Sequence, residues 1–173
     1  MSTLHTCPLP ASQPGLTRRH CLLAAAAGLT LSLGANVGAS TVAGAALPSP
    51  LSLADELALA LKKGQPLVVM VSLDGCPFCK MARENYLAPL RTQEGLPVVQ
   101  IDMRSARTVK NFSGIAQTHD ELIRSWRVKV APTVLFFGPS GAEISKRMVG
   151  AYIPDFYGAY LDERLQQARL ALR

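Results

Sequence analysis

Cysteine and aromatic residues are scarce in this sequence. Its 173 residues include 4 Cys and 1 Trp, and aromatic side chains make up 6% of the chain. Cys7 and Cys21 lie in a segment that has the features of a leader peptide, so a processed chain keeps only Cys76 and Cys79. Two cysteines exclude the disulfide framework of small secreted proteins. The remaining residues, about 128 of them, must therefore be held together by an apolar core, which a domain of this size can bury.

Histidine and clustered charge are scarce as well. After residue 45 the chain has a single histidine, His119, and a structural zinc site normally takes four protein ligands. Residues 1–45 contain two of the 18 Lys and Arg and none of the 12 Asp and Glu, so the remainder carries 16 minus 12, or +4. These basic residues are scattered and are not interleaved with aromatic residues, which argues against nucleic-acid binding.

The one long uncharged stretch lies near the N-terminus. Arg18 and Arg19 precede a run from Cys21 to Ala54 that is rich in Ala, Gly, Ser and Thr and that contains small residues at 43–45. This pattern predicts an export signal over residues 1–45 and a periplasmic mature protein. The segment 17–22 resembles a twin-arginine signal, but Cys21 stands where that signal favours a large apolar residue, so Sec export stays open. The run is long enough to span a membrane and would anchor the chain if it were not cleaved.

Beyond the leader, helical and strand patterns alternate. We expect a linker and a helix over residues 46–66, the helix opening with a capping box at Ser52–Asp55, and a folded domain over residues 67–173. Apolar runs predict strands over 67–73, 97–103, 133–137 and 143–149. Helical patterns cover 80–90, 118–126 and 154–172, and the polar segment 104–117 is expected to be a long loop with a short helix. This order predicts an α/β fold, with a central mixed sheet, flanking helices, and a C-terminal β-hairpin followed by a helix.

Several side chains are expected to have packing roles. Met81, Tyr86 and Leu90 are the expected core face of the helix over 80–90, which Pro89 should end or kink. Trp126 and Met70 are expected in the core, and His119 on the surface. The expected core face of the terminal helix consists of Phe156, Tyr160, Leu161, Leu165 and Ala168.

The strand over 67–73 leads into the sequence Cys76-Pro77-Phe78-Cys79. A helix that begins there presents free backbone N–H groups and a positive dipole end, which stabilise a thiolate at Cys76. Pro77 suits the first helical turn, and Cys79 is placed to attack a mixed disulfide formed at Cys76. Two thiolates could also bind Cu(I), whereas a structural disulfide across so short a loop would stabilise little. Reversible dithiol–disulfide exchange, which needs no cofactor and no metal, is the favoured hypothesis.

From Leu67 onward the chain resembles the thioredoxin superfamily. The resemblance rests on the strand leading to Cys76-Pro77-Phe78-Cys79-Lys80, on the segment Trp126–Phe137, and on Gly141 and Val149-Gly150-Ala151. It implies a thioredoxin fold in which Cys76 attacks a substrate disulfide and Cys79 resolves the intermediate.

The resemblance also implies a substrate groove. In that family the proline matching Pro132 is cis and lies beside the dithiol, and the backbone matching Ala131 pairs with an extended substrate segment. Pro77, Phe78, Ala131 and Pro132 would then contact the substrate. The expected partners are protein or small-molecule disulfides and a membrane or periplasmic redox partner, with the chain itself a monomer.

The departures from that family are informative. Met70 stands where thioredoxins carry a buried carboxylate, Gly75 where they carry Trp, and Pro77-Phe78 where they carry Gly-Pro. The Pro77-Phe78 dipeptide between the cysteines is closer to the dipeptides of glutaredoxins and periplasmic disulfide proteins. With the leader, the chain resembles periplasmic thioredoxin-related proteins, some of which are encoded with sulfur-oxidation or cytochrome-maturation systems.

Thioredoxin-type dithiols span reduction potentials from roughly −270 mV to −120 mV, so the direction of electron flow stays open. The alternative from another class is a copper-handling or partner-docking module that uses the same cysteines as ligands.

Overall fold

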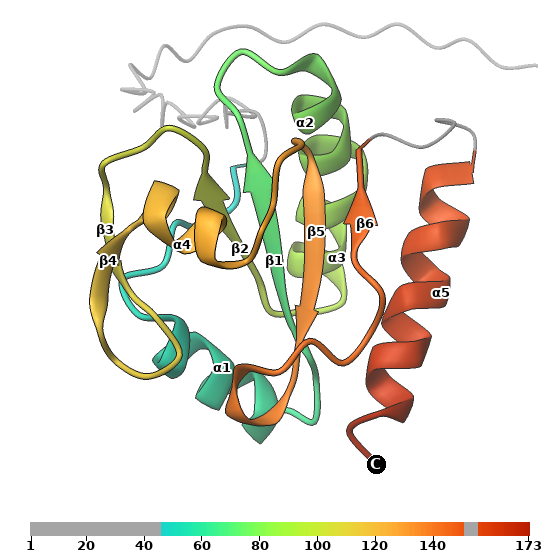
Figure 1. Cartoon of the computed structure of the whole chain (residues 1–173). Helices are drawn as coiled ribbons and strands as arrows, with labels where there is room; N and C mark the ends of the chain where they lie inside the picture. The colour runs from blue at the N-terminus through green and yellow to red at the C-terminus, as the bar shows by residue number, and fades with distance from the viewer. Residues whose placement is uncertain (1–45, 151–155) are drawn as a thin grey trace, which may run out of the picture. The chain divides into compact units, whose positions relative to one another are not determined.

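The computed structural model describes residues 46–150 and 156–173 (Figure 1). The predicted export signal, with Cys7 and Cys21, lies outside these described residues. Six strands are present in them: β1 (Leu67–Ser72), β2 (Val98–Asp102), β3 (Thr108–Lys110), β4 (Ala116–Thr118), β5 (Thr133–Phe137) and β6 (Met148–Val149). The helices are α1 (Leu53–Lys62), α2 (Pro77–Ala82), α3 (Ala88–Gln93), α4 (His119–Ser125) and α5 (Tyr157–Leu170), with a π-helical turn over Arg83–Leu87 and a 3₁₀ turn over Pro139–Gly141. No helix in the described part of the chain is long and apolar enough to cross a membrane.

The central sheet is mixed, as predicted. Its strand order is β2-β1-β5-β6, with β1 parallel to β2 and antiparallel to β5, and β6 antiparallel to β5. All six residues of β1 are buried, because helices cover both faces of the sheet, and this is why the strand is a continuous apolar run in the sequence.

Side chains of β1 alternate between two separate cores. Val68 and Met70 enter the first, which we call the cysteine core because it contains Cys79; it is completed chiefly by residues of α2, the π turn, β5 and α5. Val69 and Val71 enter the second, which we call the α1/α4 core because Leu53 and Leu57 of α1 and Leu122 and Ile123 of α4 line it. The sheet is therefore sandwiched between two helical layers.

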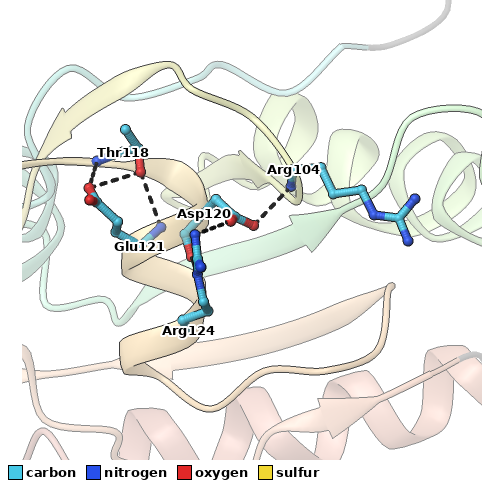
Figure 2. A network of polar contacts seen from close by, with 5 residues as sticks. All are labelled: Arg104, Thr118, Asp120, Glu121 and Arg124. Atoms are coloured by element: carbon cyan, nitrogen blue, oxygen red, sulfur yellow. Dashed lines mark hydrogen bonds and ion pairs between the residues drawn. The ribbon is translucent and has the colours of Figure 1, made fainter.

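Side-chain caps define the starts of α1 and α4, and at α1 only the Ser52 half of the predicted capping box is formed among the described residues. The hydroxyl of Ser52 accepts a hydrogen bond from the N–H of Asp55 at 3.3 Å. At α4 the capping box is reciprocal: Thr118 Oγ1 accepts from the Glu121 N–H at 3.2 Å, and Glu121 Oε2 accepts from the Thr118 N–H at 2.8 Å (Figure 2).

The helix predicted over residues 80–90 is interrupted by the π turn and then continues to Gln93. The N–H of Ala88 bonds to the carbonyl of Arg83, five residues back, and this wider turn accommodates Pro89, which has no N–H to donate. Pro89 therefore does not end the helix, as one alternative of the prediction had it, and instead lies in the first turn of α3, directly after the π turn. One extra residue also rotates the buried face by about 100°. Leu87, at the end of the turn, is fully buried. Met81, which lies before the turn, is half-buried and belongs to neither core, contrary to its predicted core position.

The segment 104–117 is not the long loop with a short helix that was predicted. Its strand β3 pairs antiparallel with β4 to form a hairpin, closed by Asn111, whose side-chain oxygen accepts hydrogen bonds from the N–H groups of Ser113 and Ile115. Only Val109 is buried in these two strands, so the apolar alternation that identifies a strand is missing.

Two further predictions near the C-terminus need correction. The strand expected over 143–149 is reduced to β6, with one isolated bridge between Phe137 and Glu143. In the terminal helix Phe156 and Tyr160 are exposed, because Tyr157 takes the inward position and sets the face that Leu161, Leu165 and Ala168 continue. The ring of Tyr157 packs against Tyr86 at a centroid distance of 4.9 Å. The predicted helix start at Pro154 lies outside the described residues.

Candidate functional site

Cys76 caps the N-terminus of α2. Gly75 precedes it with φ of 69°, a left-handed conformation that strains any residue with a Cβ, and it turns the chain from β1 into the helix. The sulfur of Cys76 accepts a hydrogen bond from the N–H of Cys79 at 3.2 Å, and Pro77 occupies the first helical position. The side chain of Cys76 is half-buried, so its sulfur combines a stabilising donor with access from solvent.

Cys79 lies one helical turn further on and is 1% exposed. Both thiols are free. Burial in the cysteine core, and then the hydrogen bond to Cys76, raise the pKa of the Cys79 thiol from 9.0 to about 11. Hydrogen bonds to the Leu73 backbone and the Ser72 side chain oppose this rise. At neutral pH Cys79 is therefore protonated and enclosed, and the two cysteines are chemically unequal.

Polar groups beneath the dithiol are hydroxyls rather than carboxylates. Met70 occupies the position of the family carboxylate and is fully buried, as expected for a packing residue. Ser72 is buried at the end of β1, and the hydroxyl of Tyr157 is buried without a hydrogen-bond partner among the described residues. Burial, and then the charge of Cys79, raise the pKa of Tyr157. Residues 46–150 and 156–173 hold no cluster of three or more His, Cys, Asp or Glu side chains that could bind a metal ion.

The loop before β5 lies at the same end of the sheet as the cysteine loop. Val71 pairs with Thr133, which brings Pro132 to the end of β1, and the peptide bond between Ala131 and Pro132 is cis. The carbonyl of Pro132 accepts a hydrogen bond from the Gly150 N–H at 2.7 Å. Ala131 packs against the cysteine core, as Cys76 does, and its backbone makes no hydrogen bond to any described residue.

Exposed apolar side chains surround this end of the sheet. Phe78 is 56% exposed between the two cysteines, Val130 is 47% exposed next to Ala131, and Val149 is 45% exposed opposite Thr133.

A groove of about 750 Å³ lies on the β2 side of Cys76, away from β5. Its walls are the ends of β1 and β2 and the first turns of the helix that starts at Pro77. Three cationic residues, Lys80, Arg83 and Arg104, and two acidic residues, Asp74 and Asp102, line it. No local sequence pattern indicates this groove, because its lining comes from two separate segments, residues 72–83 and 100–105.

The prediction that His119 is a surface residue was wrong. His119 is fully buried, and its Nδ1 accepts a hydrogen bond from the backbone N–H of Asp102 at 3.1 Å. Its Nε2 has no partner among the described residues. Burial lowers the pKa of the imidazole, the charge of Asp102 opposes this, and Arg107 lowers the pKa further. His119 thus ties α4 to the end of β2. Its partner is 17 residues away in the sequence, so no local pattern could have revealed it.

Trp126 is half-buried in an aromatic group, 5.2 Å from Phe137 and 6.3 Å from Phe112 between ring centroids. It packs against the α1/α4 core, in agreement with the predicted packing role.

A family model described as a thioredoxin-like domain matches residues 53–165. No curated protein matches the chain. Among solved structures, Fasciola hepatica thioredoxin is similar at 18% identity, covering 70% of this chain and 99% of its own, with a TM-score of 0.47. Trxlp from Edwardsiella tarda is 28% identical, covering 65% of this chain and 96% of its own, with a TM-score of 0.43. The reduced periplasmic thioredoxin SoxS from Paracoccus pantotrophus is 20% identical, covering 60% and 99%, with a TM-score of 0.39.

Proposed function

This chain belongs to the family of thioredoxin-like domains, and we propose that it is an exported thiol–disulfide oxidoreductase that acts through Cys76 and Cys79. The observation that carries the proposal is the inequality of the two thiols. Cys76 is accessible and its sulfur accepts an N–H hydrogen bond, whereas Cys79 is enclosed one turn away with its pKa raised to about 11. An attacking thiolate and a resolving thiol need this difference.

In the reducing direction the reaction has two steps. The Cys76 thiolate attacks one sulfur of the substrate disulfide, a mixed disulfide forms, and the other substrate sulfur leaves with the electron pair and takes up a proton. Cys79 then loses its proton and attacks the Cys76 sulfur, which releases the second substrate thiol and leaves a Cys76–Cys79 disulfide. The substrate is reduced by two electrons, and the dithiol is oxidised by two. The reverse sequence would oxidise a substrate dithiol.

Substrate proteins would bind on the β5 side of Cys76. The free backbone of Ala131 could pair with an extended segment by strand addition, beside Pro132, while Pro77 and Phe78 offer an apolar contact next to the reacting sulfur. A protein disulfide in an extended segment fits this surface.

The function is tested by the reduction of insulin disulfides with dithiothreitol as the electron source. We expect the protein to accelerate precipitation of the insulin B chain in proportion to its concentration. A Cys76→Ser variant is the matched control and should be inactive. Stoichiometric binding of Cu(I) to the dithiol together with no reductase, oxidase or isomerase activity would contradict the proposal and favour the copper-handling alternative.

Export is proposed from the leader pattern in residues 1–45. We expect the full-length chain, expressed in a Gram-negative host, to yield a periplasmic protein whose N-terminus lies near Ala45. Recovery of the uncleaved chain only in washed membranes would instead show that the leader acts as an anchor.

A further inference from the structure

The cationic side chains of the groove beside Cys76 form no ion pair with an acidic side chain in residues 46–150 or 156–173. Lys80 and Arg83 come from the turns that follow the dithiol, and Arg104 comes from the loop after β2. Among the described residues the ion pairs are formed by other side chains, and none involves these three. Three unpaired cations in one concave surface favour an anionic ligand.

The two acidic residues of the groove do not neutralise it. The carboxylate of Asp102 accepts a hydrogen bond from the Gln100 side chain at 2.6 Å, and Gln100 in turn accepts one from a guanidinium nitrogen of Arg83 at 3.1 Å. Gln100 therefore lies between Arg83 and Asp102, and the remaining guanidinium nitrogens of Arg83 are left for a ligand. Asp74 is exposed in the turn before Cys76. Cations outnumber carboxylates by three to two.

Arg104 is held in place through its backbone rather than its side chain. Its φ is 58°, a left-handed conformation that is uncommon outside glycine, and its N–H donates to Asp120 Oδ1 at 3.1 Å. Figure 2 shows the Arg104 side chain extending away from Asp120, whose carboxylate pairs with Arg124. The start of α4 thus fixes the backbone of Arg104 and leaves its guanidinium free to line the groove.

We propose that this groove binds the anionic end of a low-molecular-weight disulfide or mixed disulfide formed by a carboxylate-bearing thiol. Binding there places the disulfide sulfur of the anionic half at Cys76. A volume of about 750 Å³ is within the range of small-molecule sites. The inference rests on the proposed oxidoreductase function and adds a substrate class to it. Protein substrates use the apolar β5 side of Cys76, and small anionic substrates use the β2 side. The exchange itself is the two-step reaction described above. The carboxylate-bearing half forms the mixed disulfide with Cys76 as the other half leaves as a thiol, and it is released as a thiol when Cys79 attacks the Cys76 sulfur.

The test compares three small disulfides that differ in charge: dithiodipropionate, bis(hydroxyethyl) disulfide and cystamine, which are anionic, neutral and cationic. The second-order rate constant for oxidation of the reduced protein is measured with each at low ionic strength. The same rate constants for free dithiothreitol correct for the intrinsic reactivity of each disulfide. After this correction we expect the anionic disulfide to react about five- to twentyfold faster than the neutral one, and the cationic disulfide to be slower than the neutral one. Added salt should reduce the anionic preference, because exposed charges are screened.

Variants that remove single charges test whether the groove residues cause the preference for the anionic disulfide. Arg104→Gln should lower the corrected anionic-to-neutral ratio by about two- to fivefold, and Arg83→Gln combined with Arg104→Gln should lower it further. Arg91→Gln removes the same charge from an exposed position of α3 outside the groove, and it should leave the ratio unchanged.

The outcomes separate this inference from the proposed function. If the neutral disulfide oxidises the reduced protein no faster than it oxidises the Cys76→Ser variant, the oxidoreductase proposal itself fails. If the neutral disulfide reacts but the corrected ratio is near one, or if the double variant keeps the wild-type ratio, the anionic subsite is overturned.

Discussion

The two cores of this protein are built differently. On the α1/α4 side both helices begin with side-chain oxygens as caps, from Ser52 and Thr118. On the cysteine side the cap of α2 is the sulfur of Cys76, and α5 has no side-chain cap. The residue that caps this helix is also the proposed nucleophile. The caps on the α1/α4 side therefore have a structural role, whereas the cap of α2 on the cysteine side also has a proposed chemical role.

Each side also buries a titratable group, and the two groups act at opposite ends of the pH range. Burial raises the pKa of Cys79 in the cysteine core and lowers the pKa of His119 at the start of α4. The folded state thus prefers a neutral thiol on one side and a neutral imidazole on the other. Four predictions test this contrast.

The largest effect is expected from the cysteines themselves. Cys76→Ser should abolish disulfide exchange, because no other thiol is accessible to start the reaction among the described residues. Cys79→Ser should still attack and should accumulate mixed disulfides with substrate, which are visible by mass spectrometry. Faster alkylation of Cys79 than of Cys76 by iodoacetamide in the wild type would reverse the assigned roles.

A matched pair of core truncations should show whether the reactivity of Cys79 depends on the packing of its own core or on the overall stability of the protein. Leu161→Ala in the cysteine core and Leu122→Ala in the α1/α4 core remove equally buried side chains, and each should lower the free energy of unfolding by about 2–5 kcal/mol in urea titrations. Only Leu161→Ala should also speed alkylation of Cys79, since it loosens the packing of the core around that thiol. Equal acceleration by both variants would show that Cys79 is exposed through global unfolding alone.

Alkaline pH should destabilise the reduced protein through Cys79. The folded-state pKa of about 11 lies above the reference value of 9.0, so the contribution of the neutral thiol is complete below pH 9 and is lost as pH rises through 11. At ~1.4 kcal/mol for each tenfold change in proton affinity, the loss is roughly 2–3 kcal/mol. Unfolding titrations of the wild type and of Cys79→Ala, both under a phosphine reductant, measure it as the difference between their pH profiles. Parallel profiles between pH 9 and 11 would contradict the assignment.

Acidic pH should act through His119, with the smallest expected effect. A lowered pKa means that stability is complete above the unfolded value of 6.5 and is lost as pH falls through the folded value. His119→Asn places an amide oxygen where it can accept the hydrogen bond from the Asp102 N–H, but it cannot become protonated. Its unfolding free energy should therefore fall less steeply below pH 6.5 than that of the wild type. The test fails if the two acid profiles coincide.

The parts of the fold that were predictable are those with local signals. The run 67–73 lies within one residue of β1, and β5 matches its predicted span, because strands covered on both faces are continuously apolar. The capped starts of α1 and α4 follow from the spacing of Ser52 with Asp55 and of Thr118 with Glu121. The dithiol needs no long-range contact to be recognised.

Some of the parts that were missed depend on partners distant in sequence. Burial of His119 follows from its bond to Asp102 on β2, and the β3–β4 hairpin is held by backbone pairing with one buried side chain. The groove beside Cys76 brings Arg104 to Lys80 and Arg83 through the parallel pairing of β1 and β2. The His119 and groove contacts join residues of separate secondary-structure elements, whereas the hairpin is local in sequence and was missed because its strands lack apolar alternation.

The π turn over Arg83–Leu87 has a consequence for sequence comparison. A wider turn inside a continuous helix is equivalent to the insertion of one residue. We expect relatives with an uninterrupted α-helix here to align with this chain only if a one-residue gap is opened between Arg83 and Leu87. Without that gap, every position from Ala88 to Gln93 would be compared with a neighbour on the wrong face, and a shared ancestry would look weaker than it is.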